Sequence, residues 1–240
     1  MNLACAARRR RLQYAVRHGW ALAAALCLAG TAAAQPVRPA PQRPAPAAAS
    51  EPGHLATDPR VVLVMGDSLS AAYGLSAAQG WVSLTGERIA REQPGWRVVN
   101  ASISGETTAG GAARIVDAVV RHRPSVVVIE LGANDALRGL PLKQTRRNLA
   151  RMIGAAQGLG ARVLLLGMRI PPNYGPAYTA EFERGYRDLS RRFDTALVPF
   201  LLEPIATGRD NFQGDNLHPT AAAQAKIRDH VWPALAPLLR

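Results

Sequence analysis

A serine that follows an apolar run is the first candidate for chemistry in this chain. Ser68 comes after residues 61–65, which are all apolar, and a Gly-Asp pair, so its hydroxyl is expected where a buried strand ends in a turn. A serine hydroxyl is a weak nucleophile at neutral pH and needs a neighbouring base, normally a neutral histidine held by a carboxylate. Asp215 and His218, three positions apart near the other end of the chain, supply both groups. Together the three residue types predict a hydrolase that works through a serine.

Each of these motifs also has a purely structural explanation. Residues 214–216 (Gly-Asp-Asn) are a good turn sequence, and Asp215 or Asn216 is a suitable cap for the helix expected after them. Residues 66–68 equally fit an ordinary turn from a strand to a helix. The catalytic interpretation therefore depends on further motifs.

Two more polar motifs lie between the serine and the histidine. Residues 100–105 (Asn-Ala-Ser-Ile-Ser-Gly) and residues 132–135 (Gly-Ala-Asn-Asp) each follow an apolar stretch that reads as a strand. The carboxyl ends of parallel strands share one edge of a sheet, where ligands of open α/β folds bind. We therefore expect the Gly105 N–H and the Asn134 amide to join the Ser68 N–H as donors to a tetrahedral oxyanion.

These motifs, taken in chain order, resemble those of the SGNH or GDSL hydrolases. They are Gly-Asp-Ser-Leu, a glycine after Ser-Ile-Ser, Gly-Ala-Asn-Asp and Asp-Asn-Leu-His, and the resemblance covers the chain from Arg60 to about Leu239. Within that family the chain is most similar to the bacterial periplasmic arylesterase, acyl-CoA thioesterase I and lysophospholipase group, because residues 130–139 and 170–175 also resemble that group.

The resemblance implies a role for five residues. Ser68 is expected as the nucleophile, with Gly105 and Asn134 as oxyanion donors beside its own N–H, and Asp215 and His218 complete a catalytic triad. No departure from the family pattern touches these positions.

The segment 169–178 is a candidate substrate loop. It follows a predicted strand and contains two prolines and then Asn173, Tyr174 and Gly175, so we expect a long loop without a helix. Loops at strand ends shape substrate pockets, and the resemblance implies the same for these three residues. A plain strand-to-helix connection explains the segment equally well.

Strand and helix patterns alternate along the chain, which predicts an α/β fold. We expect a three-layer α/β/α sandwich with a five-stranded parallel sheet, of the flavodoxin-like kind that SGNH hydrolases have. The expected strands are 61–65, 97–100, 126–131, 163–166 and 196–198, and the expected helices are 81–92, 109–121, 142–159, 179–193 and 220 to about 239.

The first 59 residues differ in composition from the rest. Five arginines precede an apolar core at 20–30 and three alanines at 32–34, so residues 1–34 read as a Sec-type signal peptide. An uncleaved anchor is the alternative, but a membrane span needs about 20 apolar residues. Residues 35–59 are rich in Pro and Ala and read as a linker, which leaves 60–240 as one hydrolase domain. We expect a periplasmic or secreted protein.

The charge balance is basic. Without residues 1–34, which hold five arginines and no acids, 24 basic and 17 acidic residues remain, a net charge of +7. Such a balance favours peripheral contact with an anionic membrane or cell wall. The basic residues are scattered with few aromatics between them, so no specific nucleic-acid binding is expected. The five histidines show no ligand spacing, so we expect no metal and no cofactor.

We therefore expect an exported serine esterase that hydrolyses carboxylic esters through an acyl-enzyme. Its expected substrates are aryl esters and lysophospholipid or other lipid acyl esters; thioesters are chemically accessible, although coenzyme A is a cytosolic metabolite. Two alternatives stay open. The same triad could remove O-acetyl groups from a polysaccharide, and a noncatalytic lipid- or polymer-binding module could retain the fold. The sequence leaves the oligomeric state undetermined.

Overall fold

The computed structural model describes residues 60–240. The predicted signal peptide (1–34) and linker (35–59) lie outside these residues. Five parallel strands form a single sheet in the order β2-β1-β3-β4-β5. The strands are β1 (Arg60–Gly66), β2 (Trp96–Asn100), β3 (Val126–Glu130), β4 (Arg162–Leu166) and β5 (Ala196–Val198).

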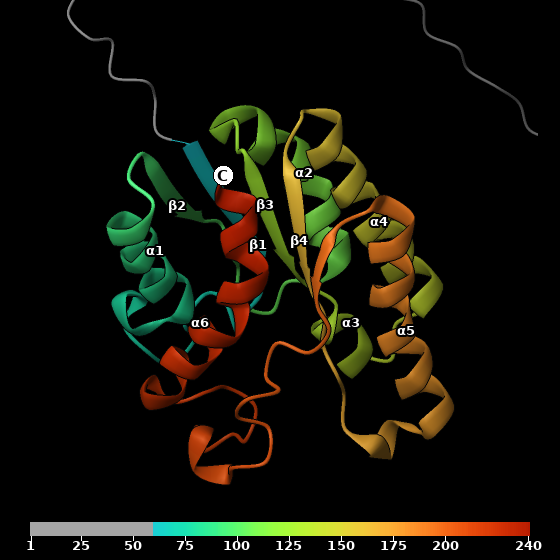
Figure 1. Cartoon of the computed structure of the whole chain (residues 1–240). Helices are drawn as coiled ribbons and strands as arrows, with labels where there is room; N and C mark the ends of the chain where they lie inside the picture. The colour runs from blue at the N-terminus through green and yellow to red at the C-terminus, as the bar shows by residue number, and fades with distance from the viewer. Residues whose placement is uncertain (1–59) are drawn as a thin grey trace, which may run out of the picture. The chain divides into compact units, whose positions relative to one another are not determined.

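Helices cover both faces of the sheet, as Figure 1 shows. Helices α1 and α6 contact each other on one face, and α2, α4 and α5 form a row on the other. The prediction of a three-layer α/β/α sandwich is confirmed. The α-helices are α1 (Trp81–Glu92), α2 (Thr108–His122), α3 (Ala133–Leu137), α4 (Leu142–Gly158), α5 (Pro176–Phe193) and α6 (Ala221–Leu235). Short 3-10 helices span Ala77–Gln79, Pro172–Tyr174, Arg209–Asn211 and Ala236–Leu239.

The central strands are apolar because both of their faces are covered. Every residue of β3 is buried, as is all of β1 after Arg60. Continuous apolar runs are typical of strands that pack helices on both sides. Among residues 60–240, no helix combines the length and the hydropathy that crossing a membrane requires.

The strand order places the functional loops at a switch point. The chain passes from β1 to β2 on one side and then returns to β3 on the other side of β1. In open parallel sheets a crevice forms at the carboxyl ends of the strands where the order reverses. Ser68 follows β1 and Asn134 follows β3, so the two neighbouring strands deliver both residues to this crevice.

Three local expectations were wrong or incomplete. The segment 169–178 was expected without a helix, but a 3-10 turn spans Pro172–Tyr174 and α5 already begins at Pro176. Proline fits the first helical position, where its missing N–H breaks no hydrogen bond. Helix α6 begins at Ala221, one residue later than expected, with Thr220 as its N-cap. Helix α3 was not predicted, because five residues are too few to show a helical period.

Candidate active site

Asp215, His218 and Ser68 form a continuous hydrogen-bonded chain. The His218 Nε2 lies 2.8 Å from the Ser68 Oγ, and the His218 Nδ1 lies 2.6 Å from the Asp215 Oδ2. When Asp215 is ionised it accepts a hydrogen bond from Nδ1–H. The unprotonated Nε2 is then free to accept a hydrogen bond from the serine hydroxyl. The arrangement can therefore remove the proton from Ser68 as the hydroxyl attacks.

The loop before α6 both orients the histidine and forms a turn. The Asp215 Oδ1 accepts the backbone N–H groups of Leu217 and His218, at 2.9 and 3.0 Å. The hydrogen bonds from the His218 backbone, the His218 ring and the Leu217 backbone together lower the pKa of Asp215 to about 2. The N-cap of α6 is Thr220, so the alternative in which Asp215 or Asn216 caps that helix is wrong.

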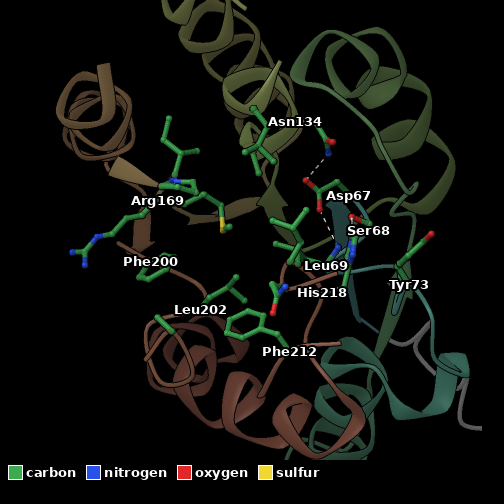
Figure 2. Close-up of a pocket in the computed structure, with 18 of the residues that line it drawn as sticks. Asp67, Ser68, Leu69, Tyr73, Asn134, Arg169, Phe200, Leu202, Phe212 and His218 are labelled. Atoms are coloured by element: carbon green, nitrogen blue, oxygen red, sulfur yellow. Dashed lines mark hydrogen bonds between the residues drawn. The ribbon is translucent and has the colours of Figure 1, made fainter. Parts of the chain in front are cut away.

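Asp67 connects the nucleophile turn to the start of α3. Its Oδ1 accepts the Leu69 N–H and its Oδ2 accepts the Asn134 side-chain amide, both at 3.0 Å (Figure 2). The carboxyl group is buried, and burial raises its pKa to about 6 despite these hydrogen bonds. Asp67 therefore fixes the turn around Ser68 through hydrogen bonds to its neighbours.

The three expected oxyanion donors line one cavity. Ser68, Gly105 and Asn134 all border it, as does His218. The Asn134 amide also donates to the Glu106 carbonyl oxygen, at 3.1 Å, so both of its hydrogens already have acceptors within the protein. An oxyanion would have to take over or share one of these hydrogen bonds.

A glycine is required where the chain turns from β3 towards Asn134. Gly132 has a φ of +123°, a conformation that residues with a side chain rarely adopt. A Cβ atom at this position would lie 2.4 Å from the Tyr186 hydroxyl oxygen. That hydroxyl is buried and donates to the Leu131 carbonyl oxygen at 2.9 Å. Tyr186 therefore fixes the turn that carries Asn134.

The cavity beside the triad has a volume of about 600 Å³ and a largely apolar lining. The Tyr73 ring packs on the His218 ring, with 4.4 Å between centroids. Figure 2 shows Phe200, Leu202 and Phe212 across the pocket from Asn134. Volumes of about 300–1,000 Å³ are usual for small-molecule sites. The remaining lining residues include Leu69, Leu137, Met168, Ile170, Ala206 and Leu217.

The candidate substrate residues Asn173, Tyr174 and Gly175 are not among the lining residues. The preceding stretch, 169–172, lines the cavity instead. The Tyr174 hydroxyl donates to the Leu137 carbonyl oxygen at 3.2 Å, which ties the 3-10 turn to α3. The structure thus brings the start of this segment to the site and leaves its middle outside.

Comparison with known families identifies the family to which this chain belongs. The model of the GDSL-like lipase/acylhydrolase family matches residues 64–226, which is more than half of the chain and includes every residue of the triad. The chain belongs to this family. The resemblance to the SGNH or GDSL hydrolases is confirmed.

Several members of the GDSL family are similar to this chain over most of their length. Esterase TesA of Pseudomonas aeruginosa is 50% identical over 75% of this chain and 90% of its own. An arylesterase of Vibrio mimicus is 41% identical over 71% of this chain and 85% of its own length. The thioesterase 1/protease 1/lysophospholipase L1 of Escherichia coli is 38% identical over 74% of this chain and 84% of its own length. The expected similarity to this group is confirmed, and so is the expectation of a carboxylic ester hydrolase.

A solved structure agrees with the fold of this GDSL hydrolase. The psychrotrophic esterase EstA from Pseudoalteromonas, in a structure inhibited by monoethylphosphonate, aligns with a TM-score of 0.72 at 39% identity. The alignment covers 75% of this chain and 98% of that one.

Sequence reasoning missed one residue of the GDSL site. Glu130 ends the otherwise apolar strand β3 and is completely buried. Its Oε2 accepts the Ser70 hydroxyl at 2.7 Å and the Asp67 N–H at 3.3 Å. Burial and the neighbouring Asp67 raise its pKa well above the usual range. A single acid in a run of five buried positions is the signal that could have identified it. Within residues 60–240 no three His, Cys, Asp or Glu side chains gather as a metal site would require.

Proposed function

We propose that this esterase cleaves carboxylic esters with Ser68 as nucleophile, His218 as base and Asp215 as the group that orients the histidine. The observation that carries this proposal is the hydrogen-bonded chain from the Asp215 Oδ2 through the His218 ring to the Ser68 Oγ. Such a chain is the arrangement that activates a serine at neutral pH. The phosphonate-inhibited structure of EstA gives further support, because phosphonates react with activated serines.

In the first half of the reaction the Ser68 Oγ attacks the ester carbonyl carbon while the His218 Nε2 takes the hydroxyl proton. The negative charge on the carbonyl oxygen is held by the N–H groups of Ser68 and Gly105 and by the Asn134 amide. To reach the oxyanion, the Asn134 amide must give up or share one of its two existing hydrogen bonds, to the Asp67 side chain or to the Glu106 carbonyl oxygen. The bond to the leaving oxygen then breaks, and that oxygen receives the proton from His218.

The second half repeats these steps with water. His218 takes a proton from a water molecule, the resulting hydroxyl attacks the acyl carbon, and the bond to the Ser68 Oγ breaks. Ser68 recovers its proton from His218, and the carboxylic acid leaves. A thioester follows the same sequence, with a thiol in place of the alcohol.

The substrates we propose are esters with an apolar acyl or aryl part, such as aryl esters and lysophospholipid or other lipid acyl esters. The cavity of about 600 Å³ with an apolar lining supports this choice. The names of the relatives, an arylesterase and a thioesterase with lysophospholipase, indicate the same classes. An acetyl group would leave most of this cavity unfilled, so the geometry does not favour polysaccharide O-deacetylation.

We also propose that the enzyme is exported to the periplasm or secreted, and that its basic surface makes peripheral contact with an anionic membrane or cell wall. The composition of residues 1–34 and the net charge support this proposal. Amino-terminal sequencing of the protein recovered from the periplasm or medium tests it. A chain that retains Met1 would contradict cleavage and export as a soluble protein.

The catalytic proposal is tested by hydrolysis of p-nitrophenyl esters from acetate to decanoate. We expect the wild-type enzyme to prefer chains longer than acetate, and Ser68→Ala to lose about 10³-fold or more in kcat. A matched control is Ser104→Ala, a serine that borders the same cavity. If Ser68→Ala kept its activity and Ser104→Ala lost it, the assignment of the nucleophile would be wrong.

A further inference from the structure

A second acidic group lies directly beneath the nucleophile turn. Glu130 is paired with Gly66 in the register of β1 and β3, and its side chain is completely buried. A Cβ atom at Gly66 would lie 2.8 Å from the Glu130 Oε2, so the last residue of β1 must lack a side chain for the carboxyl group to fit. This fit places a carboxyl group against the backbone that leads into Ser68.

Glu130 holds the turn on both sides of the nucleophile. Its Oε2 accepts the N–H of Asp67, one residue before Ser68, and the hydroxyl of Ser70, two residues after it. Ser70 is itself buried, and its carbonyl oxygen accepts the Asn100 side-chain amide at 2.8 Å. The turn is therefore fixed from β3 on one side and from β2 on the other.

The same contacts lead from Glu130 to the oxyanion donors. Asp67 is held by Glu130 through its backbone, and its side chain accepts the amide of Asn134 and the N–H of Leu69. A displacement of Asp67 would move both the turn and the Asn134 amide. Donors must point accurately at the developing charge to be effective, so such a displacement would reduce the rate more than substrate binding.

We propose that Glu130 is a positioning residue of this esterase: its buried carboxyl group fixes the nucleophile turn and, through Asp67, sets the direction of the Asn134 amide. This inference rests on the roles given above to Ser68 and Asn134. Glu130 does not touch the cavity and acts only through its neighbours.

The surroundings of Glu130 favour the neutral form of its carboxyl group. Asp67 faces it from the nucleophile turn, and the Tyr186 hydroxyl approaches from α5. On α2, Arg114 is occupied by its ion pair with Glu106. Burial and the neighbouring Asp67 disfavour the charged form of this carboxyl group and raise the pKa of Glu130 well above its usual range. Glutamine, which is neutral and has the same shape, should therefore replace it well.

The test compares Glu130→Gln, Glu130→Met and Ser70→Ala with wild type, by steady-state hydrolysis of p-nitrophenyl butyrate between pH 5 and 9. Ser190→Ala is the matched control, because this serine also donates a hydrogen bond but lies away from the site. We expect Glu130→Gln to keep kcat within about threefold, and Glu130→Met to lower kcat about tenfold or more with little change in KM. The kcat of Ser70→Ala should lie between those of Glu130→Gln and Glu130→Met.

The pH profile separates positioning from simple packing. The Glu130 side chain lowers the pKa of the Asp67 carboxyl group, and Asp67 in turn holds the Asn134 amide. Loss of the Glu130 carboxyl group in Glu130→Met should therefore move the acid limb of kcat to higher pH, and Glu130→Gln should restore it. Equal kcat and pH profiles in folded Glu130→Met and wild type would overturn the proposal, as would a Gln variant as defective as Met. If Glu130→Met does not fold, an unchanged kcat in Ser70→Ala overturns it.

Phosphonate labelling of the wild-type enzyme separates this test from the catalytic assignment. If Ser68 is not labelled, the proposed mechanism fails. If Ser68 is labelled and the Glu130 variants behave like wild type, only the positioning role fails.

Discussion

Asp215 stays ionised throughout the pH range in which a serine esterase works. Its pKa of about 2 reflects hydrogen bonds from the backbone and ring of His218 and from the Leu217 backbone. Its carboxylate therefore keeps the proton of His218 on Nδ1 at neutral and mildly acidic pH. The acid limb of the rate profile must arise from other groups.

Replacement of Asp215 by asparagine should impair chemistry and leave binding intact. The amide can hold His218 in the wrong tautomer, so we expect kcat to fall about 10³- to 10⁴-fold. KM should change little, because Asp215 does not line the cavity. Steady-state kinetics with p-nitrophenyl butyrate checks this prediction, and a variant within tenfold of wild type would contradict the role of Asp215.

Asp67 should make the stability of the protein depend on pH in the opposite direction to most acids. Its pKa is raised from 3.8 to about 6 in the folded state, so between pH 4 and 6 the folded chain binds more protons than the unfolded chain. The contribution of Asp67 to stability is therefore present below about pH 4 and is lost as the pH rises through 6.

Asp67→Asn removes this dependence. The free energy of unfolding of the variant minus that of wild type should be larger at pH 7 than at pH 4, by up to about 3 kcal/mol. Urea denaturation of both proteins at the two pH values measures the difference. A constant difference would show that the pKa of Asp67 is not raised by folding.

At the scale of the elements, long apolar runs were the most predictable features. The expected strands agree with β1 to β5 within one residue at each end. For β1, β3 and β4 the reason is that strands buried on both faces have long apolar runs. Helix starts were less predictable. Pro176 and Thr220 show why: the first was taken for a loop residue and the second for a helical one, although each suits the start of a helix.

The turn from β3 into α3 tests whether the conformation of Gly132 and the Tyr186 hydroxyl together hold the start of α3 in place. Gly132→Ala should be strongly destabilising, by about 3 kcal/mol or more, because of its positive φ and the contact with the Tyr186 hydroxyl. Tyr186→Phe alone should cost about 1–3 kcal/mol, because the Leu131 carbonyl oxygen loses its donor.

In the double variant the two changes should not add. Removing the hydroxyl makes room for the new methyl group, so Gly132→Ala should cost at least about 1 kcal/mol less when it is combined with Tyr186→Phe. Urea denaturation of the four proteins gives the coupling energy. Strictly additive effects would mean that the hydroxyl does not restrict this turn.

At the scale of the whole molecule, the cavity should set the preference for acyl chains. Each added methylene that enters an apolar site contributes about 0.8 kcal/mol, so kcat/KM should rise up to about fourfold per carbon until the cavity is filled. Ala206→Trp should shift the optimum to shorter chains, because Ala206 lines the cavity. Ala180→Trp, on an exposed part of α5, is the matched control. A best rate with acetate would instead favour a deacetylase.

The sequence indicated the five triad and oxyanion residues but not how they are connected, and it wrongly placed Asn173, Tyr174 and Gly175 at the cavity. Ser68 and His218 are 150 positions apart, and the residue types and their resemblance to known motifs were enough to bring them together. The hydrogen bond of the Asn134 amide to Asp67 and the carboxyl group of Glu130 under the turn depend on the register of β1 against β3. That register follows from packing across the sheet and cannot be predicted from local patterns.

The most direct test of the central claim is to find which serine carries the acyl group. Wild-type enzyme treated with an alkyl phosphonate and digested should yield one modified peptide, with the phosphonate on Ser68, and His218→Ala should react at least about 10²-fold more slowly. Modification of Ser68 at a rate that depends on His218 is the predicted result. An adduct on Ser102, Ser104 or another residue, or equal labelling in the His218→Ala variant, would contradict the mechanism.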